Sequence, residues 1–482
     1  MNTFNRVHTT DSSQQELVTI ATNLADEENT DGSIQDHTGS DSSAKSRAFT
    51  RRQKLTLLSI SLGNLADFIS FSILAPFYPA KANDMGASDT IVGLVFGCFA
   101  LVMFLTSPIF GKFLPQLGAK FLFLSGLFTS GISVIIFGFL DKLNPGTEFI
   151  VFCFIVRVVE GVGASASATA SFAIIAQTFP DNVSTVFGII EIFTGLGFMI
   201  GPPVGGYLYQ VGGYSLPFLV LGSCTVLVVL VNYFVLPQQG ESDRPESGSI
   251  LRLLKTPSIV VTSFCVLAGA MGVSFLDPTL ANHLQQFHLD TTAVGLMFLI
   301  ISASYTIASF FWGYMTDKFD IPKLMMILGN IGSCAAYLYL GPSPILNTKS
   351  QLWLAIISMV LLGLSLGSCL VPTFYDLIVT ARWHGMPDNL GTYGVVSGLF
   401  NSLFSLGNFI GPTFGGILVD VVGFSWAATV FSGVYLFVAL LLIVFSLWEY
   451  QCGKGRRVPI HQSEVATSVN QESDLNDPLL SD

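Results

Sequence analysis

The chain has 482 residues, of which 51% are hydrophobic and only 11% are charged. Soluble domains carry roughly 25% charged residues, so this composition excludes a protein that lies mainly in water. The formal net charge of -11 says little about partners, because the acidic residues concentrate near the two ends of the chain. We expect no nucleic-acid partner.

The chain begins and ends with polar segments. Residues 1–44 are rich in Ser, Thr, Asp and Asn and contain no apolar run, which is typical of disorder and not of a signal peptide. We predict disordered cytosolic tails over residues 1–50 and 450–482. Near the C-terminus, Leu479 and Leu480 follow acidic residues and resemble a dileucine sorting signal, to which adaptor proteins would bind.

Twelve long apolar segments follow one another between the tails. Each can cross a hydrocarbon core of about 30 Å as a helix that rises about 1.5 Å per residue, and none alternates like a transmembrane β-strand. We therefore predict an all-α integral membrane protein with twelve transmembrane helices. The predicted spans are 55–79, 90–114, 119–140, 149–178, 185–208, 216–237, 257–281, 291–316, 321–341, 351–380, 391–419 and 424–448.

The basic residues predict the orientation of these spans. Arg157 lies inside a span, and of the other Lys and Arg residues only Lys81, Lys142 and Lys349 fall on the side opposite to the two tails. Basic residues concentrate on the cytosolic side of membrane proteins. We therefore expect a multi-pass protein with both termini in the cytosol.

The chain contains an internal repeat. Residues 197–215, "GFMIGPPVGGYLYQVGGYS", and residues 407–425, "GNFIGPTFGGILVDVVGFS", match at a constant offset of 210. We predict two six-helix halves of similar fold, residues 51–237 and 257–449, joined by a cytosolic linker over residues 238–256. Two such halves with a substrate between them are the architecture of alternating-access transporters; a non-transporting receptor or scaffold is the alternative.

Several motifs resemble a known family. "GLGFMIGPPVGG" in the fifth span and "RVVEGVGASASATA" in the fourth resemble the proton-coupled antiporters of the major facilitator superfamily. "LADFISFSILAPFYP" and "FLDPTLANHL" look like the vesicular amine transporter family, and most like its polyamine-transporting branch. The resemblance covers roughly residues 50–450.

This resemblance implies a proton-coupled antiporter that loads organic cations, above all the polyamines spermine and spermidine, into acidic vesicles. The membrane would be that of a secretory or synaptic-type vesicle, an endosome or a lysosome. A broad-specificity drug or monoamine antiporter, at the plasma membrane in the drug-transporting case, is the alternative. No motif of an enzyme, cofactor site or metal site is found, so we expect none of these.

Ionisable residues inside the spans are candidates for function, because a charge at the centre of a membrane helix costs at least about 2.5–3.5 kcal/mol. Carboxylates outnumber guanidinium groups among them, which favours a cationic substrate over an anionic one. These residues are Asp67, Arg157, Glu160, Glu191, Asp277 and Asp376.

Asp67 has no basic neighbour on its own predicted helix, near whose middle it stands. The resemblance implies that this aspartate of the first span recognises the substrate amine. A structural hydrogen bond to a neighbouring helix is the alternative.

Arg157 and Glu160 are three residues apart on one predicted helix and can therefore pair. A guanidinium beside a carboxylate that gains and loses a proton would couple proton movement to a change of charge. A static ion pair that fastens the fourth span is the alternative.

Four further residues are candidates for substrate binding. Glu191 corresponds to Asn401 across the repeat, and monoamine-transporting relatives lack an acid at the Glu191 position. Carboxylates spread over several helices would suit a polycation. Asp277 precedes Pro278 and could hold a second ammonium group or act as a gate, unless it is simply solvated at a helix end. Tyr305 offers an aromatic face for a cation–π contact.

A last group of residues is predicted to support conformational change. Glycine and proline in the repeated motif would allow helices to approach closely and bend. Asp317 and Lys318 in "GYMTDK" resemble a superfamily motif whose acid holds a neighbouring helix terminus, and Pro115 replaces that acid in the first half. The residues of the repeated motif are Gly201, Pro202, Pro203, Gly411 and Pro412.

Overall fold

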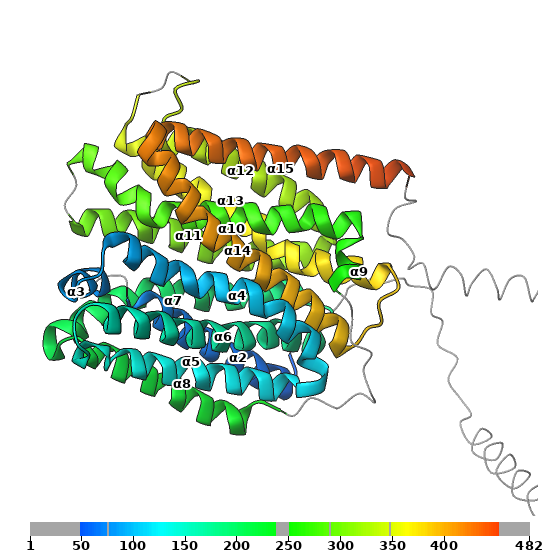
Figure 1. Cartoon of the computed structure of the whole chain (residues 1–482). Coiled ribbons are helices and arrows are strands. Elements are labelled where there is room, and N and C mark those ends of the chain that lie inside the picture. The colour runs from blue at the N-terminus through cyan, green and yellow to red at the C-terminus, as the bar shows by residue number, and fades with distance from the viewer. Residues whose placement is uncertain (1–48, 75–76, 238–249, 289–290, 347–348, 453–482) are drawn as a thin grey trace, which may run out of the picture. The chain divides into compact units, whose positions relative to one another are not determined.

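The computed structural model describes residues 49–74, 77–237, 250–288, 291–346 and 349–452. Within these ranges, twelve helices are long and apolar enough to cross a membrane, which confirms the predicted fold class (Figure 1). The dileucine-like Leu479 and Leu480, most of the two predicted tails and most of the linker lie outside the described residues.

The helices of the first half are α2 (Arg51–Ser72), α4 (Asp89–Leu117), α5 (Ala119–Phe137), α6 (Thr147–Thr178), α7 (Val183–Gly212) and α8 (Ser215–Val235). Those of the second half are α10 (Pro257–Leu284), α11 (Thr291–Phe319), α12 (Pro322–Leu340), α13 (Leu352–Trp383), α14 (Leu390–Val422) and α15 (Phe424–Cys452). Four short helices connect them: α3 (Tyr78–Asp84), η1 (Leu140–Lys142), α9 (Ile250–Leu254) and η2 (Gln285–Phe287).

The predicted first span, 55–79, is divided in the structure. α2 ends at Ser72, and Pro79 is the second residue of the separate helix α3. Proline is favourable in a first helical turn, where no backbone N–H is needed. Consequently Asp67 lies five residues from the end of α2 and not near the middle of a longer helix.

The glycines of the repeated motif pack helices together within each half. Ser72 of α2 donates a hydrogen bond to the carbonyl oxygen of Gly197 of α7 (3.2 Å), and Ser274 of α10 donates to Gly407 of α14 (3.3 Å). The same contact therefore occurs in both halves. α7 and α14 continue as helices through the prolines of the motif.

The two ends of the long helices differ in packing. We call the end at which α2 begins and α15 ends the linker face, because α9, which belongs to the predicted linker 238–256, lies at the same end (Figure 1). The short helix α3 lies at the opposite end. One hydrophobic core cluster joins both halves and includes Phe179, Leu253 and Ile378 near the linker face. The other two clusters each stay within one half. The halves are therefore sealed together by apolar side chains at the linker face.

Candidate substrate and proton site

Arg157 and Glu160 of α6 form an ion pair inside the first half. The guanidinium Nη1 lies 2.9 Å from Glu160 Oε2, and both side chains are buried. Glu160 thus neutralises the guanidinium locally. Four phenylalanine rings surround the Arg157 guanidinium, with centroids 5.1–6.0 Å from its carbon, a distance that allows cation–π attraction; they are those of Phe71, Phe96, Phe99 and Phe137.

The guanidinium is only partly satisfied by this arrangement. Among the described residues, Arg157 Nε and Nη2 have no hydrogen-bond acceptor. A buried donor without a partner is costly, so the guanidinium depends on Glu160 and on the aromatic rings. The sequence predicted the pair, but the aromatic surroundings come from three other helices and could not be predicted.

Asp67 is held by α6 as well. Its Oδ2 accepts a hydrogen bond of 2.7 Å from Ser167 Oγ. In the described part of the chain no Lys, Arg or His forms an ion pair with Asp67. The carboxylate therefore has a structural hydrogen bond, and it also retains the charge that a substrate amine would need.

Glu191 and Tyr305 meet across the two halves. The Tyr305 hydroxyl of α11 donates a hydrogen bond of 2.9 Å to Glu191 Oε2 of α7. Both residues were predicted for substrate binding, and the structure brings them together. Their contact joins the halves directly, so a ligand or proton that takes this carboxylate would act on the interface between them.

Asn401 occupies the corresponding position in the other pair of helices. Its Nδ2 donates to Ser107 Oγ of α4 (2.9 Å), and Ser107 Oγ is 2.8 Å from Ser165 Oγ of α6. Asn401 is buried. It therefore fastens α14 to α4 and α6, whereas Glu191 fastens α7 to α11 through an ionisable group.

Asp277 and Asp376 stand apart from these contacts. The Asp277 side chain of α10 is exposed, and no hydrogen bond joins it to the other candidate residues that the structure describes. Asp376 is buried in α13 and accepts a hydrogen bond of 2.6 Å from Thr262 of α10. Asp376 thus fits a structural role.

A cluster of four phenylalanines, which we call the phenylalanine tetrad, closes the linker face. Two of its members come from each half, and in every pair the ring centroids lie 5.3–5.6 Å apart. The four residues as a group are not among those predicted from the sequence. A signal existed, because Phe172 and Phe374 are related by the 202-residue offset that also relates the "GKFLPQLGAK" and "GYMTDK" segments. The tetrad consists of Phe172, Phe187, Phe374 and Phe400.

Asp317 makes a second contact between the halves at the linker face. Its Oδ1 and Oδ2 accept hydrogen bonds from the backbone N–H groups of Ser184 (3.1 Å) and Thr185 (2.6 Å), in the first turn of α7. The start of α14 is capped differently, since Asn389, the N-cap residue directly before this helix, accepts from Thr392 N–H at 3.0 Å. Lys318 lies over the rings of Tyr314 and Phe319.

The described residues contain no group of three or more His, Cys, Asp or Glu side chains that could hold a metal ion. The site is built instead from single carboxylates, one guanidinium and aromatic rings. Such a set can bind an organic cation and exchange protons.

The sequence profile described as Major Facilitator Superfamily matches this chain twice, at residues 60–284 and 262–466. The first match covers most of the first half and continues through α10, and the second match begins within α10 and covers the rest of the second half. The chain belongs to the major facilitator superfamily. A structure named as that of the human organic anion transporter MFSD10 (TETRAN) has the same fold, with a TM-score of 0.64 and 18% identity, and the match covers 81% of this chain and 99% of that one.

Several relatives within the superfamily have sequences more similar to this chain than that of the MFSD10 structure. The human "MFS-type transporter SLC18B1" is 43% identical over 88% of this chain and 94% of its own length, and the mouse protein of the same name is 40% identical over 87% and 92%. The human "Synaptic vesicular amine transporter" is 26% identical over 73% of this chain and 66% of its own length. These relatives are named as transporters and not as enzymes, in agreement with the sequence analysis.

Proposed function

We propose that this superfamily member is a proton-coupled antiporter that moves organic polycations, such as spermine and spermidine, into acidic vesicles. The observation that carries the proposal is the distribution of charge. Glu160 neutralises Arg157, whereas Asp67 and Glu191 stand on different helices, and no cation of the described residues is paired with either. Two separated carboxylates suit a substrate with two or more ammonium groups.

The net negative charge of the site argues against an anionic substrate. Arg157, the only Lys or Arg inside the twelve spans away from their ends, already has its carboxylate partner in the described structure. An anion would therefore meet uncompensated carboxylates at Asp67 and Glu191. Opposite charges in a medium of effective dielectric constant about 20 attract by about 4 kcal/mol at 4 Å, and an anion would be repelled to a similar extent.

The Arg157–Glu160 ion pair and the nearby substrate cation suggest how protons are coupled to transport. When Glu160 takes up a proton, its ion pair with Arg157 is lost and the buried guanidinium gains an uncompensated charge. That charge would repel a cation held nearby. Proton entry from the acidic side would therefore favour release of the substrate on that side, as an exchanger requires.

The linker face supplies one gate of an alternating-access cycle. The phenylalanine tetrad and the Asp317 contacts both cross between the halves there. Substrate could reach the site from the linker face only after these contacts separate. In the orientation that the basic residues predict, this face is cytosolic, and the described conformation is the one closed to the cytosol.

Transport by the purified full-length protein tests the proposal. In proteoliposomes with an acidic interior, radiolabelled spermine should accumulate, and nigericin, which collapses the pH difference, should abolish accumulation. Protein-free liposomes are the control for leak and for binding to lipid.

The alternatives give different outcomes in the same assay. The cluster of Phe68, Phe71, Phe99 and Phe198 rings could accept an apolar cation. A drug or monoamine antiporter would therefore take up apolar cationic drugs or monoamines and leave spermine outside. A receptor or scaffold would transport no cation. Either result would contradict the proposed function.

A further inference from the structure

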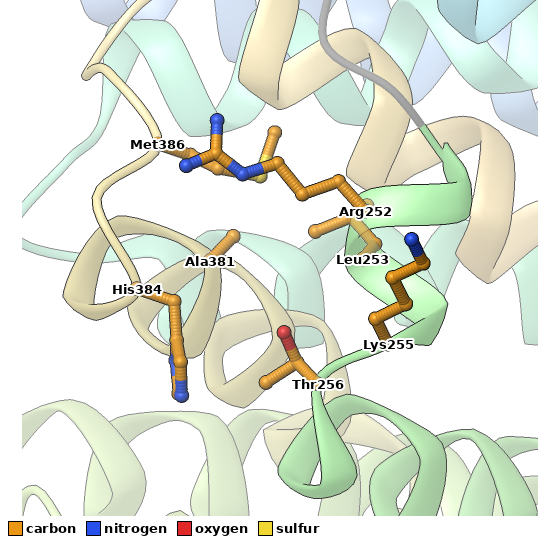
Figure 2. Close-up of a pocket in the computed structure, with 7 residues that line it drawn as sticks. All are labelled: Arg252, Leu253, Lys255, Thr256, Ala381, His384 and Met386. Atoms are coloured by element: carbon orange, nitrogen blue, oxygen red, sulfur yellow. The ribbon is translucent and has the colours of Figure 1, made fainter.

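A cavity of about 230 Å³ lies at the linker face, between α9 and the end of α13 (Figure 2). None of its lining residues belongs to the transport site described above. It is smaller than the roughly 300–1,000 Å³ pockets that enclose drug-sized ligands, so it suits a compact group. Its walls include Arg252, Lys255, Thr256, Ala381, His384 and Met386.

The walls of the cavity are basic. Arg252 and Lys255 are both exposed, and within the described ranges neither forms an ion pair with a carboxylate. None of the lining residues is acidic. In Figure 2 the Arg252 side chain extends from α9 towards Met386, on the other wall. Two exposed cations at one cavity favour an anionic ligand.

The position of α9 indicates where this anion comes from. Leu251 is 72% exposed and Leu254 is 42% exposed, whereas Leu253 between them packs into the core. α9 immediately precedes the membrane helix α10. Exposed leucines next to exposed cationic residues at the end of a membrane span are typical of a segment that lies on the lipid surface.

We propose that this cavity binds the phosphorylated headgroup of an anionic membrane lipid, with Arg252 and Lys255 supplying the charge and the leucines of α9 contacting the acyl chains. Anionic lipids concentrate in the cytoplasmic leaflet. The inference therefore depends on the cytosolic orientation of the linker face given under the proposed function. It does not depend on the substrate or on proton coupling.

Lipid retention by the full-length protein tests the inference without any transport measurement. The protein is reconstituted in nanodiscs of phosphatidylcholine with 5% of a fluorescent phosphatidylinositol phosphate, and the affinity is measured by titration with unlabelled lipid of the same headgroup. The double variant Arg252→Gln/Lys255→Gln should bind this lipid at least about tenfold more weakly, because the headgroup phosphates then lose both cationic side chains that line the cavity.

A double variant elsewhere on the linker face is the matched control. Lys54 of α2 and Lys112 of α4 are also exposed, so Lys54→Gln/Lys112→Gln removes the same charge and should keep the original affinity. Equal losses in the two double variants, or no loss in either, would overturn the inference. Binding of free inositol phosphate with the same affinity as the lipid would also overturn it, since it would show that the membrane-facing leucines contribute nothing.

Discussion

The two unpaired carboxylates differ in the contact that holds each of them. Asp67 accepts one hydrogen bond from Ser167 within the first half, whereas Glu191 accepts one from Tyr305 across the halves. Asp67 can therefore bind an ammonium group without disturbing the interface. Glu191 cannot, because a ligand that competes for its carboxylate also competes with Tyr305.

Asp67→Asn should weaken spermine binding. The amide can still accept the Ser167 hydrogen bond, so the substitution removes charge and leaves the packing intact. Two opposite charges 4 Å apart attract by about 1 kcal/mol in water and by about 4 kcal/mol at an effective dielectric constant of about 20. Loss of this attraction between Asp67 and an ammonium group would lower the affinity roughly 5- to 1,000-fold. Equilibrium binding of labelled spermine to purified protein measures it. Asp84→Asn, at an exposed position at the end of α3, is the control, and an unchanged affinity in Asp67→Asn would contradict the assignment.

Glu191→Gln should change selectivity as well as affinity. If Glu191 holds a second ammonium group, the variant should lose about tenfold or more of its affinity for spermine while its affinity for a monovalent amine changes little, since a monovalent amine needs one carboxylate. Competition binding with spermine and with propylamine measures the ratio. Tyr305→Phe keeps the carboxylate and is the control. Equal losses for both amines in Glu191→Gln would argue against a site for polycations.

At the scale of whole elements, α7 makes contacts both within the first half and with the second half. It packs on α2 through the glycines of the repeated motif, contacts α11 through Glu191, and begins at the turn that Asp317 of α11 caps. Its counterpart α14 packs on α10 in the same way but has its own cap at Asn389. The two halves thus share their internal packing and differ in the contacts that join them.

Gly411→Ala should destabilise the protein. A Cβ at this position would lie 2.5 Å from the carbonyl oxygen of Met271, which is backbone and cannot turn aside, whereas a Cβ at Gly416 would meet nothing within 4 Å. Overpacking of this kind typically costs about 1–3 kcal/mol. The thermal unfolding midpoint of Gly411→Ala in detergent should therefore fall clearly below that of Gly416→Ala. Identical midpoints would show that α14 does not need this close approach to α10.

Asp317→Asn should loosen the linker face. The variant removes a carboxylate from the first turn of α7, where negative charge is favourable by about 0.3–2 kcal/mol, so the equilibrium should shift by up to about 30-fold away from the closed conformation. Distances between spin labels on the linker-face ends of the two halves measure the populations. Asp320→Asn is the control, because Asp320 accepts its hydrogen bond from Tyr375 within the second half. An unchanged distance distribution in Asp317→Asn would show that Asp317 does not hold the gate.

At the scale of the whole molecule, the contacts at the linker face define one state of a transporter. The hydrophobic cluster that spans both halves includes all four rings of the tetrad, whereas the remaining two clusters each belong to one half. The halves can therefore rock apart at the linker face only if the tetrad separates, while each half keeps its own core.

A reversible cross-link across the tetrad should stop transport. In a variant whose seven native cysteines are replaced, Phe172→Cys/Phe374→Cys places thiols on opposite halves, where the rings are 5.5 Å apart. A short bis-methanethiosulfonate reagent should then abolish spermine uptake, and reduction should restore it. In Phe172→Cys/Phe187→Cys both thiols lie in the first half, with ring centroids 5.4 Å apart, so cross-linking should leave uptake largely intact. Uptake that persists in the cross-linked Phe172→Cys/Phe374→Cys variant would show that the halves need not separate at this face.

The sequence predicted the fold because twelve apolar segments of membrane-crossing length leave few other choices, and the match between residues 197–215 and 407–425 indicated two halves. It also predicted the Arg157–Glu160 pair, since both residues stand on one helix. It placed Asp67 in the middle of a longer helix, because an apolar run does not show that α2 ends at Ser72.

By itself the sequence determined which parts of this protein lie in the membrane and which ionisable residues go with them, because hydrophobicity and local spacing are properties of the chain. Only the tertiary structure decided which of those residues meet: Glu191 with Tyr305, Asp317 with the start of α7, and the four phenylalanines with one another. Each of these contacts joins residues far apart in the chain. Which of them form depends on how the two halves pack against each other, and no local pattern records that packing.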